Sequence, residues 1–150
     1  MTKVRPAALA YPDTSYPAVS IPDLSRTEER RRLSAAALRA LFNIVDRWEV
    51  RDEDTRKLLG DISNGTYYKL KLKPRGKTLD QDRLRRISYL IGIFKSLNIL
   101  YSQRLADQWM RLPNTNPIFA GSTPLEYVVR GGQPAMDMVR RLLDARRGGR

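Results

Sequence analysis

Two helices and the turn between them are encoded in residues 52–72, DEDTRKLLGDISNGTYYKLKL. The first helix opens with three acidic residues, and Asp52 is its expected N-cap. Gly60 supplies the turn, because glycine adopts a positive φ at no steric cost. Ser63 then caps a second helix, expected over residues 64–70. A short helix, a glycine turn and a serine-capped helix form the helix-turn-helix pattern.

The second of these helices carries side chains suited to DNA. Short hydrogen-bonding groups come first and lysines follow, which is the order that a helix in the major groove needs for base edges and phosphates. We therefore predict a DNA-binding surface made by Ser63, Asn64, Thr66, Tyr67, Lys69, Lys71 and Lys73.

Two features of the same segment favour other conformations. Gly65 lies inside the predicted helix and costs roughly 1 kcal/mol relative to alanine there. Residues 69–73 alternate lysine and leucine, and a period of two fits a strand as well as the end of a helix. We expect the helix to fray into a basic loop at residues 74–77, with a strand as the alternative.

The positive charge of the chain is concentrated in and after this segment. The formal net charge is +12. Residues 1–62 carry 11 basic and 10 acidic side chains, whereas residues 63–86 carry 8 basic and 2 acidic ones. A basic region beside a neutral one is typical of proteins that contact polyanions, most often nucleic acid. Solubility alone is the alternative explanation.

The part of the chain before the helix-turn-helix divides into an arm and a helix. Four prolines interrupt residues 1–25, which predicts a flexible arm without helical structure. A helix is expected to begin near Ser25 or Thr27. Its core-facing stripe consists of Leu33, Ala37, Leu41, Ile44, Val45 and Trp48.

Further helices are expected after the basic loop. Thr78 and Gln81 match a capping box, and the long helix that follows is expected over residues 79–100. A shorter helix over residues 102–110 precedes a proline-rich irregular loop over residues 113–121.

The last part of the chain predicts two helices separated by glycines. Thr123 and Glu126 match a second capping box, and Gly131-Gly132 ends the helix that it opens. Pro134 begins the last helix, and residues 146–150 form a flexible basic tail. The residues expected to pack inward from this helix are Ala135, Met138, Val139, Leu142 and Leu143.

A series of landmarks runs through the last third of the chain. They are Trp109, Pro113-Asn114, Asn116-Pro117, Phe119, Pro124-Leu125 and Gly131-Gly132. In this order they resemble the toxin-binding domain of the MbcA/ParS/Xre antitoxin family. The similarity extends upstream through residues 86–95 to the helix-turn-helix and covers about residues 27–150.

The resemblance implies an antitoxin of a RES-Xre toxin–antitoxin pair. Such a protein binds a RES-domain toxin that consumes NAD, covers the toxin's active site and represses its own operon by DNA binding. The implied organisation is all-α: a flexible arm (1–25), an Xre-like helix-turn-helix bundle (26–78), and a helical toxin-binding domain that begins with the long helix (79–150). A homodimer within a toxin–antitoxin hetero-oligomer is expected, because two-fold symmetric proteins match palindromic operators.

The candidate toxin-binding residues each have a structural alternative. Aromatic side chains anchor interfaces but also support loops from inside. Asparagines more often hold turns than contact partners, and an arginine run is suited to an enzyme pocket, to DNA phosphates or simply to solvent. The candidates are Trp109, Asn114, Asn116, Phe119, Arg140, Arg146, Arg147 and Arg150.

Composition argues against several function classes. The chain has no histidine and no cysteine, so the commonest general base, the commonest soft metal ligands and disulfides are lacking. We expect no enzyme activity, no cofactor, no membrane span and a cytoplasmic location. Two alternatives stay open: a transcriptional regulator whose C-terminal domain only oligomerises, and an interaction module, such as a localisation factor, without a specific DNA site.

Overall fold

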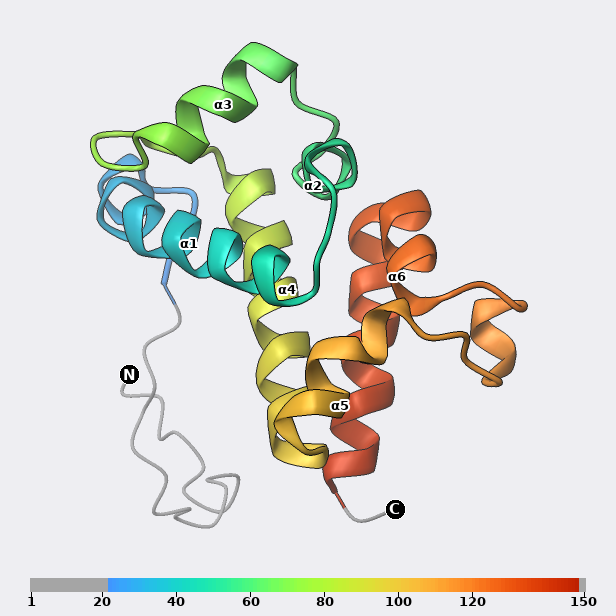
Figure 1. Ribbon diagram of the computed structural model, residues 1–150. Helices are drawn as coiled ribbons and strands as arrows, with labels where there is room; N and C mark the ends of the chain where they lie inside the picture. Colours follow the sequence, from blue (N-terminus) through green and yellow to red (C-terminus); the bar gives the residue numbers. More distant parts are fainter. Residues whose placement is uncertain (1–21, 149–150) are drawn as a thin grey trace, which may run out of the picture.

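The computed structural model describes residues 22–148, and every regular element among them is helical (Figure 1), which confirms the predicted all-α fold. The α-helices are α1 (Thr27–Arg47), α2 (Asp52–Leu58), α3 (Asn64–Leu72), α4 (Gln81–Leu100), α5 (Gln103–Gln108) and α6 (Pro124–Arg147). Two 3-10 helices, η2 (Trp109–Arg111) and η3 (Pro117–Phe119), lie between α5 and α6. None of the helices within residues 22–148 combines the length and apolar character needed to cross a bilayer.

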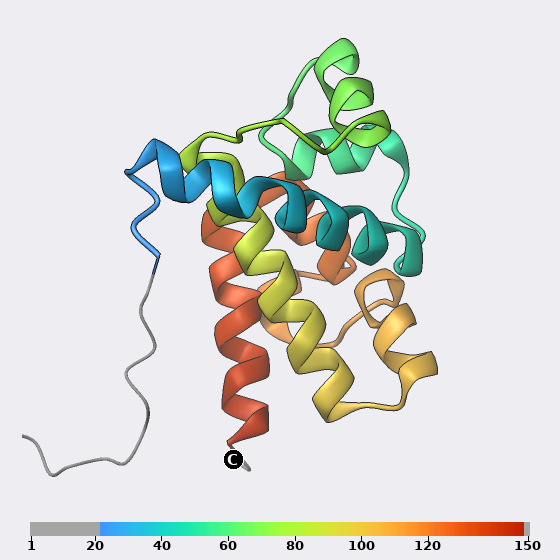
Figure 2. The same ribbon diagram turned by 90° about the vertical axis from the view of Figure 1, so that its left-hand side faces the viewer.

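Helix α4 is the element that both halves of the molecule share. It packs against α1 on one side and runs beside α6 on the other (Figures 1 and 2). Its buried residues Ile87, Leu90, Ile93 and Leu97 recur every three or four positions and belong to one hydrophobic core with those of α1 and α6. The helix-turn-helix and the C-terminal unit therefore share a core instead of being joined by a free linker.

The predicted helix-turn-helix is confirmed with small changes at the helix ends. Helix α2 begins at Asp52 itself, so its N-cap is Arg51 and the prediction of Asp52 as N-cap was wrong by one residue. Gly60 has a φ of 92°, as the turn requires. The alternation of lysine and leucine remains helical up to Leu72, so the strand alternative does not hold.

The capping box predicted at Thr78 is wrong. Helix α4 begins two residues later than that box requires, and the Asp80 carboxylate caps it by accepting the Arg83 backbone N–H at 2.8 Å. The backbone N–H of Leu79 instead donates to the Ser34 hydroxyl of α1 at 2.8 Å. This contact ties the loop to α1 and keeps the chain extended where the box would have turned it.

Helix α6 has the predicted capping box at Thr123 and Glu126, and its axis is broken at Gly132, where φ is 66° and ψ is −148°. The non-helical backbone at Gly132 separates two helical segments within α6, as the glycines at residues 131–132 predicted. Its buried face contains Met136, whereas Met138 is 43% exposed, so the prediction for Met138 was wrong. The helix continues through Arg147, which corrects the predicted tail at residues 146–147.

Candidate functional site

The beginning of α3 presents polar groups on the surface. The Ser63 hydroxyl accepts the Thr66 backbone N–H at 3.2 Å and donates to the Thr66 hydroxyl at 2.9 Å. Asn64, Gly65 and Thr66 are all exposed. Gly65 has open space around it, so no contact demands glycine at this position. The first turn of α3 therefore offers hydroxyl and amide groups to a ligand such as the edge of a base pair.

Tyr67, which was predicted to contact DNA, lies inside the protein. It is 1% exposed, its ring packs edge-on against Phe42, and its hydroxyl donates to the Asp52 carboxylate at 2.5 Å. Burial, and then the hydrogen bond to Asp52, raises the pKa of the Tyr67 hydroxyl. Tyr67 thus fixes the position of α3 relative to α2, and its ring is not offered to DNA.

The Asp52 carboxylate is the junction between α2 and α3. Besides Tyr67, it accepts from the Lys71 ammonium at 2.9 Å and from the Tyr68 hydroxyl at 3.3 Å. The hydrogen bond from Tyr67 and that from Lys71 lower the pKa of Asp52 below its ordinary value. One of the predicted DNA-binding lysines, Lys71, is therefore already paired with an acid of the same domain.

Lys69 and Lys73 are exposed and form no ion pair with any residue of the range 22–148. Arg39 of α1 and Arg75 lie with Lys73 around a shallow surface depression after α3. The sequence analysis missed Arg39 because it lies more than 30 residues earlier, on a helix interpreted only through its apolar stripe. The basic loop after α3 thus gains a cation from α1.

The loop between η2 and α6 is held by its own side chains. The Asn114 amide oxygen accepts the backbone N–H of Asn116 at 2.9 Å, and the Asn116 amide oxygen accepts that of Ile118 at 3.1 Å. Ala120 follows with a φ of 48°, an uncommon conformation for a residue other than glycine. Both asparagines therefore have the turn-holding role that was considered as the alternative to partner contact.

Trp109 of η2 and Phe119 of the loop pack together on its inner side. Phe119 is 1% exposed, and its ring packs edge-on against Trp109 at 6.1 Å and against Tyr127 of α6 at 5.3 Å between ring centroids. The aromatic rings fix the loop to α6. The surface that the loop exposes to a partner is formed by other residues, namely Leu112, Pro113, Thr115, Pro117, Ala120 and Gly121.

A cavity of about 260 Å³ opens between this loop and the first half of α6. Ile118, Phe119 and Tyr127 form its apolar part, and the exposed Arg130 lies at its edge. Sequence analysis did not single out Arg130. In the sequence Arg130 is a single arginine before Gly131-Gly132, and only the packing of the loop against α6 brings it to this cavity.

Three of the predicted toxin-binding arginines lie along the seam between α6 and α4. Arg140 extends across Gly92, where any side chain would collide with its guanidinium group. Arg146 donates to the Tyr101 hydroxyl at 2.9 Å, and Arg147 donates to the buried Ser96 hydroxyl at 3.2 Å. These arginines hold the two helices together, and each remains at least partly exposed. Arg150 lies outside the described residues.

The geometry provides two separate surfaces, one around α3 and one at the loop before α6. In the part of the chain that the structure covers, no group of three or more acidic side chains is placed to hold a metal ion. The acidic residues Asp52 and Glu126, whose pKa values are lowered by hydrogen bonds, each serve a helix junction or a helix cap. The charged groups thus have structural roles or face solvent.

Comparison with known proteins assigns the two halves. Residues 27–92 match the family model of the antitoxin Xre-like helix-turn-helix domain, and residues 96–149 match that of the antitoxin Xre/MbcA/ParS C-terminal toxin-binding domain. The chain is 39% identical to the uncharacterized protein y4oB of Sinorhizobium fredii over 115 residues, which cover 76% of this chain and 86% of that protein. No solved structure matches. The chain therefore belongs to the Xre/MbcA/ParS antitoxin family and combines a helix-turn-helix domain with a toxin-binding domain.

Proposed function

We propose that this antitoxin neutralises a RES-domain toxin that consumes NAD, by covering the toxin's active site, and that it represses its own operon. The observation that carries the proposal is the presence of both family domains in one chain. The two domains expose different surfaces, one polar and basic around α3, the other formed by the loop before α6 and by the arginines of α6.

The DNA-binding half of the proposal rests on the exposed face of α3. We propose that Ser63, Asn64 and Thr66 contact base edges and that Lys69 and Lys73 contact phosphates. Dimeric helix-turn-helix proteins match palindromic operators, so we propose a homodimer.

The toxin-binding half rests on the rigidity of the C-terminal unit. A loop fixed by buried aromatic rings and asparagine-held turns binds without a large ordering cost. Arg140, Arg146 and Arg147 are at least partly exposed. Guanidinium groups suit a pocket built for a dinucleotide's phosphates. We propose that the protein acts in the cytoplasm without catalysis or a cofactor of its own.

The proposal is tested by co-expressing the chain with the RES-domain enzyme of the adjacent gene. We expect restored growth and a restored cellular NAD level. A chain truncated after Leu143 should lose this rescue because it lacks Arg146, Arg147 and the Asp144 carboxylate that pairs with Arg147. Circular dichroism of the truncated chain must show that α1–α4 remain folded. Lack of rescue by the full chain rules out neutralisation of that RES-domain enzyme.

Operator binding is measured separately with the chain's own promoter DNA. The truncated chain should still bind this DNA with the same dependence on salt concentration. If the full chain binds DNA with sequence preference but never rescues growth, the protein is a transcriptional regulator whose C-terminal domain serves another purpose. If it rescues growth without binding its promoter, the autorepression half fails.

A further inference from the structure

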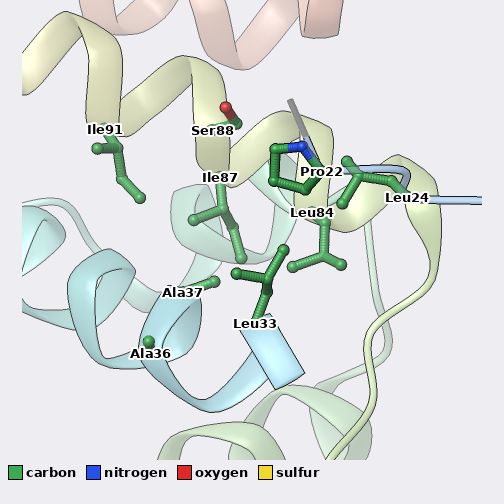
Figure 3. A pocket seen from close by; sticks show the side chains of 9 residues that line it. All are labelled: Pro22, Leu24, Leu33, Ala36, Ala37, Leu84, Ile87, Ser88 and Ile91. Atoms are coloured by element: carbon green, nitrogen blue, oxygen red, sulfur yellow. The ribbon is translucent and has the colours of Figure 1, made fainter. Parts of the chain in front are cut away.

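An apolar groove lies between α1 and α4 at the point where the described chain begins. Its volume is about 410 Å³. Figure 3 shows Leu33 and Ala37 of α1 facing Leu84, Ile87 and Ile91 of α4 across the same space. None of the residues that line it carries a charge. Apolar surface of this kind is unfavourable in water, and a groove of this shape commonly marks a binding surface.

The chain is held at the mouth of this groove. Arg30 of α1 donates to the backbone carbonyls of Leu24 and Ser25 at 2.9 and 3.0 Å, and the Asp23 carboxylate accepts the Ser25 N–H at 3.0 Å. Pro22 and Leu24 themselves line the groove (Figure 3). Pro22, the first described residue, therefore lies at the groove itself.

The sequence just before this point is suited to such a groove. Residues 14–22 carry no charged side chain, and the last four of them before Pro22 are Ala18, Val19, Ser20 and Ile21. In an extended chain alternate side chains point to the same side, so Val19 and Ile21 share one apolar face. We propose that residues 18–21 occupy the groove of their own chain in an extended conformation, with Val19 and Ile21 directed between α1 and α4.

The lengths agree with this placement. Leu84 and Ile91 are seven residues apart on α4, which corresponds to roughly 10 Å along the helix. Four extended residues span roughly 13 Å. Residues 18–21 are therefore long enough to cover the groove from the side of Leu84 to that of Ile91.

Attachment favours this occupant over a second molecule. A segment that continues directly from Pro22 needs no linker, so its effective concentration at the groove is in the millimolar range or above. A separate chain loses translational and rotational freedom on binding the same surface. Docking of residues 18–21 would add contacts between α1 of the helix-turn-helix domain and α4. Helix α6 of the toxin-binding unit also packs against α4.

The absence of cysteine in the chain permits a direct test. In full-length protein carrying Val19→Cys and Ser88→Cys, we expect mild oxidation to form a disulfide within one chain, identified by peptide mapping under non-reducing conditions. Such a bond needs Cβ atoms about 3.5–4.5 Å apart. Ser88 is exposed, so its substitution leaves the fold intact. The matched control pairs Val19→Cys with Thr115→Cys, at an exposed position in the loop before α6.

A linkage no more frequent than in the control pair overturns the proposal, and so does a linkage found only between chains, which identifies a second copy as the occupant.

A second measurement uses methyl NMR of the otherwise unmodified protein. Val19→Asp should shift the methyl resonances of Ile87 and Ile91, whereas Ser15→Asp, with the same charge outside residues 18–21, should leave them in place. Equal spectra for both variants contradict the docking.

Discussion

Helix α3 and the loop before α6 are both surfaces assigned to binding, and they use their characteristic residues in opposite ways. In α3 the polar residues that were predicted to bind DNA, such as Asn64 and Thr66, are exposed on the surface. At the loop, the two large aromatic side chains, Trp109 and Phe119, are buried and support it from inside. A helix satisfies most of its own backbone hydrogen bonds, and in the first turn of α3 the Ser63 hydroxyl accepts the Thr66 N–H, so the Asn64 side chain is free for a ligand. An irregular loop must use its side chains to hold itself.

The first prediction concerns the buried aromatic rings that support the loop, and it has the largest expected effect. Phe119→Ala should lower the free energy of unfolding by about 3–5 kcal/mol, because it removes a buried ring that contacts both Trp109 and Tyr127. Thr115→Ala, in the same loop but exposed, is the control and should change stability by less than about 0.5 kcal/mol. Urea denaturation measures both. Similar values for the two variants would mean that the loop is not supported from inside.

The second prediction concerns the kink that turns the first half of α6 toward the loop. Gly132 has a φ of 66° and a ψ of −148°, a combination that is essentially confined to glycine. Gly132→Ala should therefore destabilise the fold by about 1–3 kcal/mol. Gly65→Ala in α3, where glycine has a helical backbone and open space, should instead stabilise it by up to about 1 kcal/mol. Thermal unfolding of the pair distinguishes the two glycines by sign.

The part of the fold that sequence predicted depends on local chemistry. The caps at Ser63 and Thr123 and the turn at Gly60 involve residues within a few positions of each other, and all three are confirmed. The capping box at Thr78 failed for a non-local reason, because Leu79 is held by Ser34 of α1, 45 residues away. A sequence pattern cannot contain that contact.

For the candidate sites, too, the errors of prediction come from packing that a local sequence pattern does not contain. Tyr67 was assigned to DNA on the polarity of its neighbours, yet the phase of α3 places it on the buried side with Leu70. Met138 was assigned to the core because it lies three residues after Ala135, but the buried stripe of α6 passes through Met136 and Val139 instead. Arg39 joins the basic surface only through packing of α1. Residue type predicted the kind of surface, and tertiary contacts decided which residues form it.

The third prediction concerns the lysines of α3. Lys69 is unpaired within residues 22–148, whereas Lys71 is bonded to Asp52. Lys69→Ala should therefore weaken promoter binding and reduce the slope of log affinity against log salt by about 1, and Lys71→Ala should reduce it by clearly less. Fluorescence anisotropy over a series of salt concentrations gives both slopes. Equal losses would show that DNA displaces Asp52 from Lys71.

The smallest expected effect is the pH dependence of the junction at Asp52. Hydrogen bonds from Tyr67 and Lys71 hold the pKa of this carboxyl below its ordinary value of 3.8. A carboxyl whose pKa is lowered by folding stabilises the protein above its ordinary pKa, and this stabilisation is lost as the pH falls toward the lowered value. Wild-type protein should thus lose more stability than Asp52→Asn on acidification from roughly pH 5 to 3. The difference is small because nearly half of the Asp52 side chain is exposed, at 45%. Parallel pH curves in urea denaturation would show that Tyr67 aligns α3 through its ring packing alone, without a contribution from the charge on Asp52.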